Sequence, residues 1–307
     1  MSLPGVTPEP FNMAKQFPHI ANRHPCFSGG ASLNRGRVHL PVSPACNIRC
    51  RFCKRSSNAR AFNENEERPG VSAELVKPAE AAALTRRALK LCPEISVAGI
   101  AGPGDTLATH HALETFEIIH REFPNLINCL STNGLLLERY TEDLLRVGVQ
   151  TITVTVNAVD PVILEKICSG VLFEGNIYEG VEGASILIEA QRRGIKKAAG
   201  LGALIKINIV LIPGINSEHI GDIARAAAEN GAALINLIPL IPQFEFEGRP
   251  RPDCEALNRA REAAEAWLPV FRHCRHCRAD ACGIPGREEF ASRLYGEKRY
   301  EETFSHG

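Results

Sequence analysis

Three cysteines, Cys46, Cys50 and Cys53, follow an apolar stretch in C-x3-C-x2-C spacing. Thiolates are soft ligands that suit iron–sulfur chemistry, and three of them can hold three irons of a cubane [4Fe-4S] cluster. The fourth iron then has no protein ligand, so it can bind a small molecule and pass it an electron. The spacing therefore favours catalysis over electron storage. A tetrahedral zinc site that takes its fourth ligand from elsewhere in the chain is the alternative.

A second group of candidate ligands exceeds what one such cluster needs. It comprises His24, Cys26, Cys129 and the C-x2-C pair of Cys274 and Cys277. A C-x2-C pair brings two thiolates within reach of one metal or cluster, and Cys129 comes at the end of an expected strand. We therefore expect these ligands beside the first cluster. The alternatives are a buried small hydrophobe for Cys129 and a surface zinc knuckle for the pair.

The remaining cysteines and histidines give weaker signals. The cysteines without ligand-like neighbours, which we expect to be structural, are Cys92, Cys168 and Cys254, and Cys282 is left open. The other histidines that offer a nitrogen ligand are His19, His273 and His276.

Alternating strands and helices are expected to position these side chains. Apolar runs rich in β-branched residues predict strands over 38–44, 94–100, 126–130, 151–156, 204–211 and 234–240. Amphipathic stretches predict helices over 79–91, 107–122, 136–147, 181–193, 217–230 and 253–267. This order predicts a parallel sheet covered by helices, with an open Rossmann-like sheet as the alternative to a partial barrel. In both folds ligands gather at the carboxyl ends of the strands.

The two ends of the chain depart from this repeat. Residues 1–36 are rich in Pro, Gly and Asn without a clear period, so they predict an extended lead-in. Residues 37–245 hold the strand–helix units, and residues 246–307 form a C-terminal extension whose cysteine tail is expected to fold back over the mouth of the barrel. We therefore predict one α/β domain with two extensions that contribute ligands.

Glycines and polar residues stand where the strands are expected to end. Glycines after the second strand leave backbone groups open to a close ligand, whereas a turn capped by Asp105 or Thr106 is the alternative. An aromatic ring at Phe52 could pack beside a base. The candidates for binding a small molecule are Gly102, Pro103, Gly104, Asp105, Ser131, Asn133, Asn157 and Phe52, with Thr155 and Asn208 also expected at the mouth.

Composition excludes some classes of function. The 35 basic and 35 acidic residues balance, so no general attraction to nucleic acid or to an anionic membrane is implied. No apolar run approaches the ~20 residues that cross a bilayer, and the N-terminus lacks the pattern of a signal peptide. The 11 cysteines are then more plausible as metal ligands than as disulfides. We expect a cytoplasmic protein.

The C-x3-C-x2-C motif resembles that of the radical S-adenosylmethionine (SAM) superfamily. The resemblance implies that SAM occupies the open iron and is cleaved by one electron to methionine and a 5′-deoxyadenosyl radical. It also implies that the glycine-rich segment binds the SAM ammonium group. The common Gly-Gly-Glu pattern is replaced here by Ala-Gly-Pro-Gly-Asp, residues 101–105.

A wider set of segments is similar to the NifB family of nitrogenase cofactor maturases. The segments are His-Pro-Cys-Phe-Ser (24–28), Pro-Ala-Cys-Asn-Ile-Arg-Cys-Arg-Phe-Cys (44–53), Arg-Pro-Gly-Val (68–71), Val-Ala-Gly-Ile-Ala-Gly-Pro-Gly-Asp (97–105), Cys-Leu-Ser-Thr-Asn-Gly-Leu (129–135) and Cys-Arg-His-Cys-Arg-Ala-Asp-Ala (274–281). This resemblance implies a partial (β/α)6 TIM-type barrel in the short form that lacks a NifX-like domain. It further implies that two auxiliary [4Fe-4S] clusters are fused, with a SAM-derived carbide and one extra sulfur, into the 8-iron precursor NifB-co.

The same resemblance implies the ligands and partners. Cys46, Cys50 and Cys53 carry the SAM cluster, and the auxiliary ligands are Cys26, Cys129, Cys274 and Cys277, with His24 less firmly assigned. Iron–sulfur cluster donors and a cofactor carrier or scaffold protein are the expected partners. The family commonly has one more cysteine after the SAM motif, but residues 54–67 contain none. We therefore expect one auxiliary cluster to have fewer protein ligands or a substitute ligand.

Two other functions stay open at this point. One is a radical SAM enzyme whose auxiliary clusters persist while it modifies a peptide or a small molecule. The other is a carrier that stores iron–sulfur clusters without chemistry. The sequence also leaves the proton acceptor open, with Glu64, Glu66 and Glu67 as candidates, and it leaves the sulfur donor, the electron donor and the oligomeric state open.

Overall fold

Six parallel strands form the centre of the molecule. The computed structural model describes residues 13–53, 75–275 and 277–296. Its main sheet runs in chain order through β1 (Gly36–His39), β3 (Ile95–Ile100), β4 (Ile127–Thr132), β5 (Val149–Thr155), β8 (Leu204–Leu211) and β9 (Leu234–Pro239). Every neighbouring pair among these six strands is parallel. The arrangement confirms the predicted partial (β/α)6 barrel rather than a Rossmann-like sheet, whose strand order reverses at a switch point.

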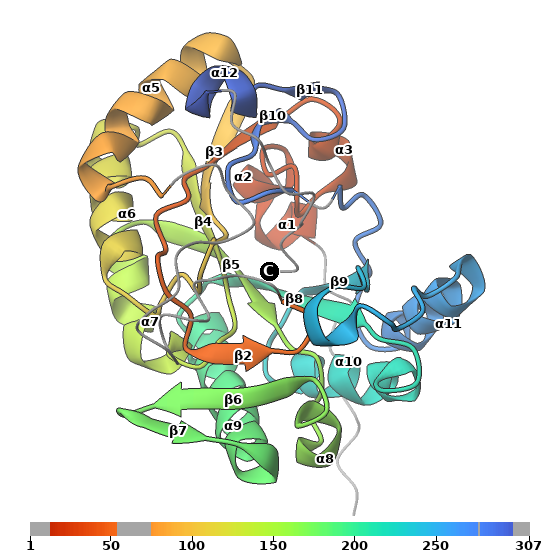
Figure 1. Ribbon diagram of the computed structural model, residues 1–307. Coiled ribbons are helices and arrows are strands. Elements are labelled where there is room, and N and C mark those ends of the chain that lie inside the picture. Colours follow the sequence, from red (N-terminus) through yellow and green to blue (C-terminus); the bar gives the residue numbers. More distant parts are fainter. Residues whose placement is uncertain (1–12, 54–74, 276, 297–307) are drawn as a thin grey trace, which may run out of the picture.

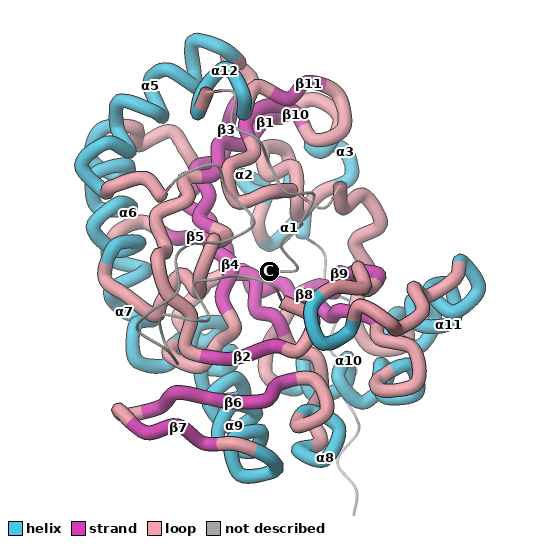
Figure 2. Tube along the Cα trace, in the orientation of Figure 1, coloured by secondary structure: helices cyan, strands magenta, loops and turns pink. Residues whose placement is uncertain are grey.

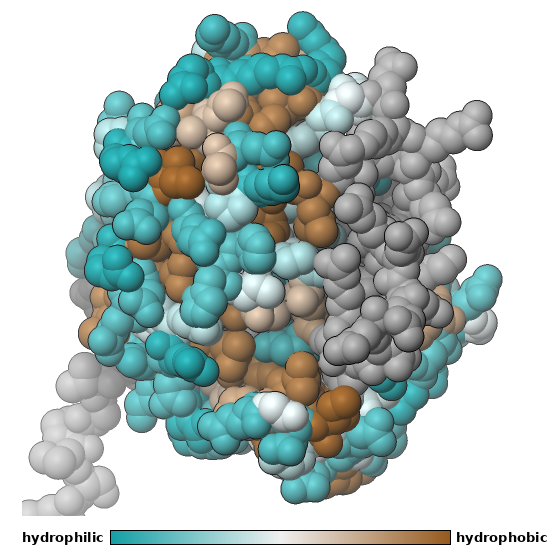
Figure 3. All heavy atoms as spheres, turned by 60° about the vertical axis from the view of Figure 1, so that its left-hand side comes forward, coloured by the Kyte–Doolittle hydropathy of each residue, from teal (hydrophilic) through white to brown (hydrophobic). Residues whose placement is uncertain are grey.

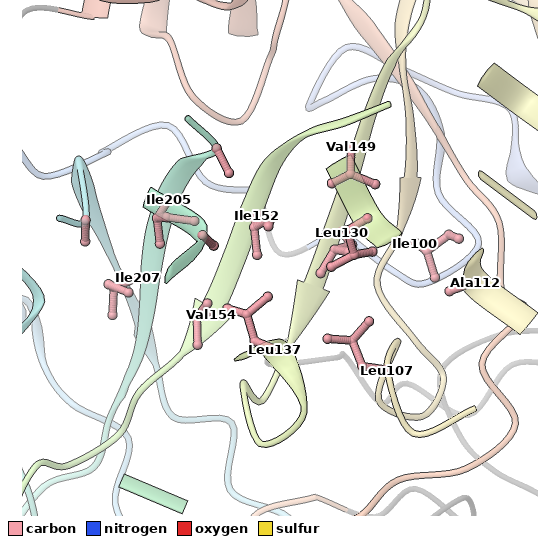
Figure 4. Packing of buried hydrophobic residues seen from close by; sticks show 14 of the residues in the cluster. Ile100, Leu107, Ala112, Leu130, Leu137, Val149, Ile152, Val154, Ile205 and Ile207 are labelled. Carbon is pink, nitrogen blue, oxygen red and sulfur yellow. The ribbon is translucent and has the colours of Figure 1, made fainter. Parts of the chain in front are cut away.

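Helices cover the outer face of this sheet (Figure 1). They are α5 (Ala81–Leu91), preceded by the 3-10 turn η1 (Pro78–Glu80), α6 (His111–Glu122), α7 (Leu137–Arg146), α9 (Gly180–Gly200), α10 (Ile220–Glu229) and α11 (Cys254–Glu265). A second short turn, η2 (Ser217–His219), leads into α10. Figure 4 shows how Ile100, Leu130 and Ile152 from the strands pack toward Leu107, Ala112 and Leu137. Burying one such side chain contributes about 1.5–3 kcal/mol, so this packing fixes the strand ends relative to one another.

Several predicted boundaries are wrong, among them the end of the helix predicted over 181–193, which runs to Gly200 as part of α9 (Gly180–Gly200), and two of the errors have a clear cause. The first strand ends at His39 rather than at residue 44, because Pro41 has no N–H to continue a ladder. The helix expected from residue 107 begins at His111, because the carboxylate of Asp105 accepts a hydrogen bond from the N–H of Leu107 and holds a turn there. Neither Asp105 nor Thr106 is therefore the N-cap of that helix.

A small antiparallel sheet carries the cysteine motif. It consists of β2 (Ile48–Cys50), β6 (Cys168–Phe173) and β7 (Asn176–Tyr178), and it lies beside α8 (Pro161–Leu164) and α9 (Figures 1 and 2). In this sheet Cys50 is the register partner of Cys168. The second cysteine of the motif is thus held in a strand, which the sequence did not predict.

The N-terminal extension is helical, in contrast to the predicted extended lead-in. It forms α1 (Met13–Gln16), α2 (Pro18–Ala21) and α3 (Gly29–Ser32). Helices of four residues are too short to show a 3.6-residue period, so the pattern could not reveal them. They are stabilised by tertiary packing, because Ile20 and Phe27 are buried against Leu204 and Leu234 at the starts of β8 and β9.

In its described part, the C-terminal extension bridges the gap between the two edge strands of the barrel. It follows the turn η3 (Phe244–Phe246) and includes α11. Beside β9, the N–H groups of Ile235 and Phe271 bond to the carbonyls of Pro269 and Ile235. It ends beside β1 as β10 (Cys282–Ile284), which pairs antiparallel with that strand and continues into β11 (Glu288–Glu289) and α12 (Ala291–Tyr295). Residues 272–275 and 277–281, which include Cys274 and Cys277, therefore cross from one edge of the sheet to the other.

No helix in the described part of the chain is both long and apolar enough to span a membrane. The helix-covered side of the molecule is mainly hydrophilic, with apolar residues scattered over it (Figure 3).

Candidate functional site

A first cavity lies at the carboxyl ends of the strands, between the sheet and the cysteine loop. It encloses about 740 Å³ of empty space, part of it open to solvent. Its lining includes the three motif cysteines together with the following predicted and unpredicted residues: Phe52, Gly104, Asp105, Ser131, Asn133, Thr155, Asn157, Cys168 and Gln191. A cavity of this size and mixed lining fits one small molecule beside a cluster. Gly102 and Pro103 are not among the lining residues.

Gly104 has a packing role that its place in a glycine-rich segment did not reveal. A Cβ on this residue would overlap the backbone of Ala45, which directly precedes the first motif cysteine. The N–H groups of Gly104 and Asp105 donate to the carbonyls of Ser43 and Ala45 at 2.8 Å each. The segment after β3 therefore supports the cysteine loop from below, in addition to lining the cavity.

Asp105 orients the end of β4. Its buried carboxylate accepts hydrogen bonds from the N–H of Leu107 at 2.9 Å, the hydroxyl of Thr132 at 3.0 Å and the N–H of Asn133 at 2.6 Å. A carboxylate with this many donors is held in one orientation and ties two strand ends together. This arrangement favours an orienting role for Asp105 over direct contact with a bound molecule.

The amides around the cavity are also used for positioning. The amide nitrogen of Asn133 donates to the side-chain oxygen of Asn47 in the cysteine loop at 2.6 Å. The side-chain oxygen of Asn157 accepts from the N–H of Val210 at 2.9 Å. Gln191 of α9, which the sequence analysis missed, donates to the carbonyls of Asn133 at 2.7 Å and Thr155 at 3.0 Å. The signal that could have revealed Gln191 in the sequence is a polar residue on the buried face of a long helix.

Two further residues border the motif cysteines. Phe52 is buried, and its ring centroid lies 6.4 Å from that of Phe246. Cys168, expected to be structural, lines the cavity beside its register partner Cys50, and its thiol donates to the carbonyl of Gly170 at 3.3 Å. The cavity therefore holds a fourth thiol that the local sequence did not mark.

A second cavity lies inside the barrel, next to the first. It encloses about 810 Å³ of empty space, and all five predicted auxiliary ligands line it: His24, Cys26, Cys129, Cys274 and Cys277. Ala101 and Ser131 belong to the walls of both cavities. The two groups of cysteines are thus brought to adjoining spaces.

Three separate parts of the chain supply these ligands. Cys26 comes from the N-terminal extension, and Cys274 and Cys277 come from the segment that bridges β9 and β1. Cys129 is the third residue of β4 and points into the barrel, so its predicted place at the strand end is wrong. The second cavity accordingly lies deeper than the strand ends where the sequence placed every ligand.

Polar residues at alternate strand positions complete the second cavity. Arg37 and His39 on β1, and Lys206 and Asn208 on β8, all face it. Side chains two apart in a strand share a face, so polar residues at this spacing in a buried strand signal a polar interior. The sequence analysis named only Asn208, at the mouth.

The buried thiols of this cavity resist ionisation. Burial raises the pKa of Cys26 to about 12, against the lowering effect of the Lys206 ammonium. Burial also raises the pKa values of Cys129 and Cys277. The Arg37 guanidinium donates to the sulfur of Cys277 at 3.3 Å. These thiols are therefore protonated near neutral pH and lose their protons only when a metal centre replaces them.

The two buried histidines present opposite tautomers to the cavity. The Nδ1 atom of His39 donates to the carbonyl of Arg278 at 2.8 Å, which leaves Nε2 with a free lone pair. The Nδ1 atom of His24 instead accepts from the N–H of Cys26 at 3.1 Å, so its Nε2 carries the proton and has no partner among the described atoms. Burial lowers the pKa of His39 to about 4 and that of His24 well below its usual value, so both rings are neutral.

His39 owes its position to a glycine. A Cβ on Gly99 would lie 2.8 Å from Cδ2 and 3.2 Å from Nε2 of this imidazole. Gly99 pairs with Cys129 in the sheet, so the ring lies over the strand next to that cysteine. The sequence analysis missed His39 because this residue lies inside the first predicted strand and belongs to no cysteine motif.

The described side chains fit clusters better than a single ion. No three His, Cys, Asp or Glu side chains within these ranges converge closely enough to hold one metal ion. The ligands of a cubane bind separate irons at different corners, so they do not need to meet at one point. The buried Nε2–H of His24, which has no partner among the described atoms, is a donor available to an acceptor inside the cavity.

Other predicted residues lie elsewhere. His19 is exposed and outside both cavities, whereas His273 lines the second. The cysteines that line neither cavity are Cys92 and Cys282, both buried, and Cys254, which is exposed. The residues that fall outside the described ranges are His276, Glu64, Glu66 and Glu67.

A family model described as the Radical SAM superfamily matches residues 40–227. The chain therefore belongs to the radical SAM superfamily, and it uses SAM and a [4Fe-4S] cluster. It is 47% identical over 288 residues to the FeMo cofactor biosynthesis protein NifB of Methanocaldococcus infernus, and 46% identical over 287 residues to that of Methanocaldococcus jannaschii, with 94% of each chain covered in both cases. Within the superfamily, it is a member of the NifB family of FeMo cofactor biosynthesis proteins.

One longer relative and two solved structures are also similar to this chain. The NifB protein of Klebsiella pneumoniae is 41% identical, with 87% of this chain and 58% of the relative covered. Streptococcus suis SuiB bound to S-adenosylmethionine matches with a TM-score of 0.56 at 14% identity, covering 76% of this chain and 49% of that one. Methylornithine synthase PylB matches with a TM-score of 0.52 at 16% identity, covering 79% and 65%. These two structures support the fold alone.

Proposed function

We propose that this protein fuses two [4Fe-4S] clusters into NifB-co, the 8-iron precursor of the nitrogenase active-site cofactor. A SAM-derived carbon ends as a carbide inside the product, and one extra sulfur is added. The clusters in the second cavity are thus substrate, whereas the cluster on the cysteine motif stays with the protein.

The single observation that carries this proposal is the common wall of the two cavities. Ala101 and Ser131 line both, so a small molecule in the first cavity borders the sulfur-rich second cavity. Transfer of a carbon from SAM to a cluster needs this proximity, because reacting groups must be held within contact distance.

Residues of the first cavity hold SAM and its cluster. Cys46, Cys50 and Cys53 bind three irons, and the bound cluster supplies the electron that cleaves SAM. Ser131 and Asn157 offer polar contacts to SAM, and Phe52 offers an apolar face. Asp105 and Asn133 keep the loop and the strand ends in register through the hydrogen bonds described above.

Residues of the second cavity hold the cluster substrate. We assign Cys26, Cys129, Cys274 and Cys277 as sulfur ligands, supplied by β4 and by the extensions at 1–36 and 246–307. For the nitrogen ligand His39 is favoured over His24, because only His39 presents an unprotonated Nε2. His24 then donates its Nε2–H to a sulfide. The raised thiol pKa values mean that loading of the cluster releases protons, which favours exchange of the cargo over permanent binding.

We further propose that iron–sulfur cluster donors load this site and that a carrier or scaffold protein receives the product. Thiols that must stay reduced suit the cytoplasm.

The test is anaerobic reconstitution with iron quantitation and electron paramagnetic resonance (EPR), with and without SAM. We expect more than one cluster per chain, with only one signal responding directly to SAM binding. Incubation with SAM and reductant should yield methionine and 5′-deoxyadenosine, and an iron–sulfur species should leave the protein. A matched control is Cys254→Ala, which removes an exposed cysteine outside both cavities.

Two results would contradict the proposal. Auxiliary clusters that persist through turnover would indicate an enzyme that modifies a peptide or a small molecule. Absence of SAM cleavage by fully loaded protein would indicate a carrier.

A further inference from the structure

Lys206 is a buried cation without a carboxylate partner among the residues that the structure describes. It lies on β8 with 6% of its surface exposed and lines the second cavity. In the ranges 13–53, 75–275 and 277–296, no Asp or Glu forms an ion pair with it, and none lines this cavity. Burying an unpaired ammonium is costly, so an anion is expected to enter the cavity.

The ammonium is aimed by three groups. Its Nζ donates to the carbonyl of Cys26 at 3.1 Å and lies 4.7 Å from the ring centroid of Phe27 and 5.6 Å from that of Phe271. An ammonium has three N–H bonds, and the carbonyl accepts one of them. The described residues supply no hydrogen-bond acceptor for the other two. The aromatic faces stabilise the cation without neutralising it.

Arg37 provides the contrast on the opposite wall. Its guanidinium is also buried, but it pairs with Glu289 at 2.8 Å and donates to Cys277 at 3.3 Å. Its charge is therefore balanced locally. Lys206 has no such partner in the described ranges, and it lies close enough to Cys26 and Cys129, both assigned above as ligands, to lower their pKa values against the effect of burial.

We propose that Lys206 is a positioning residue that binds the anionic sulfide face of the cluster substrate. This inference rests on the proposed function of the second cavity. The bridging sulfides and the cysteine thiolates carry the negative charge of such clusters, so the sulfur face that a cluster presents to Lys206 is anionic. The ammonium donates its two remaining N–H bonds to sulfide or thiolate sulfur. This contact helps to hold the cluster substrate, for which residues 54–67 offer no cysteine ligand.

The experiment uses the full chain, reconstituted anaerobically with iron and sulfide. Lys206→Met removes the charge at similar length, and Lys206→Arg keeps it. The matched control is Lys197→Met, a surface lysine of α9 paired with Glu142 at 2.9 Å. Two quantities are measured: iron and sulfide retained after desalting at low and high salt, and the reduced fraction of each EPR signal at fixed potentials. The SAM-cluster signal serves as an internal reference, because Lys206 does not line the first cavity.

We expect K206M to lose at least about half of its auxiliary iron on desalting at high salt. In the auxiliary clusters that remain, the ratio of reduced to oxidised form should fall by about tenfold, because a nearby positive charge favours the added electron. K206R and K197M should match wild type, and the SAM-cluster signal should be unchanged in all four proteins.

Three results would overturn the inference, each in a different way. If K206M retains as much iron and sulfide as wild type and its auxiliary clusters have unchanged potentials, Lys206 does not bind the cluster substrate, and the proposed function is unaffected. Loss of the SAM-cluster signal in both K206M and K206R would assign Lys206 to folding. A wild-type chain that binds only the SAM cluster would overturn the proposed function and the role of Lys206 with it.

Discussion

Gly99→Ala is the sharpest test of the nitrogen ligand, because it displaces the ring of His39 without substituting any candidate ligand. The new Cβ would lie 2.8 Å from Cδ2 and 3.2 Å from Nε2 of His39. The ring cannot simply tilt away, since its Nδ1–H is held by the carbonyl of Arg278 at 2.8 Å. The substitution must therefore break that hydrogen bond or displace Nε2 within the cavity.

The expected cost follows from three effects. Overpacking a buried site costs about 1–3 kcal/mol, and the lost hydrogen bond costs about 1 kcal/mol. The gain from restricting the unfolded chain offsets about 0.4–1 kcal/mol. We therefore expect the free energy of unfolding of the metal-free protein to fall by about 1–3 kcal/mol. A matched control is Gly248→Ala, because a Cβ there meets nothing within 4 Å, so its effect should stay within about 0.5 kcal/mol.

Two measurements check this prediction. Chemical denaturation of the metal-free protein gives the stability change, and pulsed EPR of the loaded protein gives the nitrogen coupling of an auxiliary cluster. We expect G99A to weaken or abolish that coupling while the SAM-cluster signal persists. Unchanged stability together with an unchanged nitrogen coupling would refute the assignment of His39. Loss of the coupling in His24→Gln, but not in His39→Gln, would reverse it.

Three other perturbations address separate parts of the site. Asp105→Asn replaces one carboxylate oxygen with an NH2 group, so the N–H of either Leu107 or Asn133 loses its acceptor. Unfolding should become easier by about 1–3 kcal/mol, and SAM should bind more weakly. Asp143→Asn, in a surface ion pair, should cost at most about 1 kcal/mol, and equal effects of the two substitutions would argue against the network. Cys168→Ala removes the thiol beside Cys50 and should lower the reduction potential of the SAM cluster by on the order of 40 mV, the equivalent of about 1 kcal/mol for one electron. Cys254→Ala should leave this potential unchanged, and a redox titration followed by EPR measures both variants. Because the pKa of His39 falls from 6.5 to about 4 on folding, the unfolded chain binds the proton first, so stability is full above pH 6.5 and declines as the pH falls toward 4. The metal-free wild type should lose up to about 3 kcal/mol over this window relative to His39→Gln, and parallel stability curves for the two proteins would contradict the assignment.

The sequence analysis found the class of chemistry and most of the framework from local patterns. The spacing of Cys46, Cys50 and Cys53 is a property of eight consecutive residues, so it survives without knowledge of the fold. The six parallel strands could also be predicted from the sequence, because apolar runs of strand length alternate with amphipathic stretches. Errors arose where a single residue overrides the pattern, as Pro41 does after β1 and Asp105 does before α6.

What the sequence determined by itself was therefore the set of groups able to bind iron and the order of the elements that carry them. Only the tertiary structure decided which groups meet. Cys26, Cys129 and Cys277 come together because the C-terminal extension crosses from β9 to β1, a path set by pairing between strands far apart in the chain. The tautomer of His39 depends on a carbonyl 239 residues away. The absence of Asp and Glu from the described lining around Lys206 likewise depends on which strands and extensions meet there. Local periodicity records which way a side chain points along its own element, whereas coordination and charge balance depend on neighbours that only folding supplies.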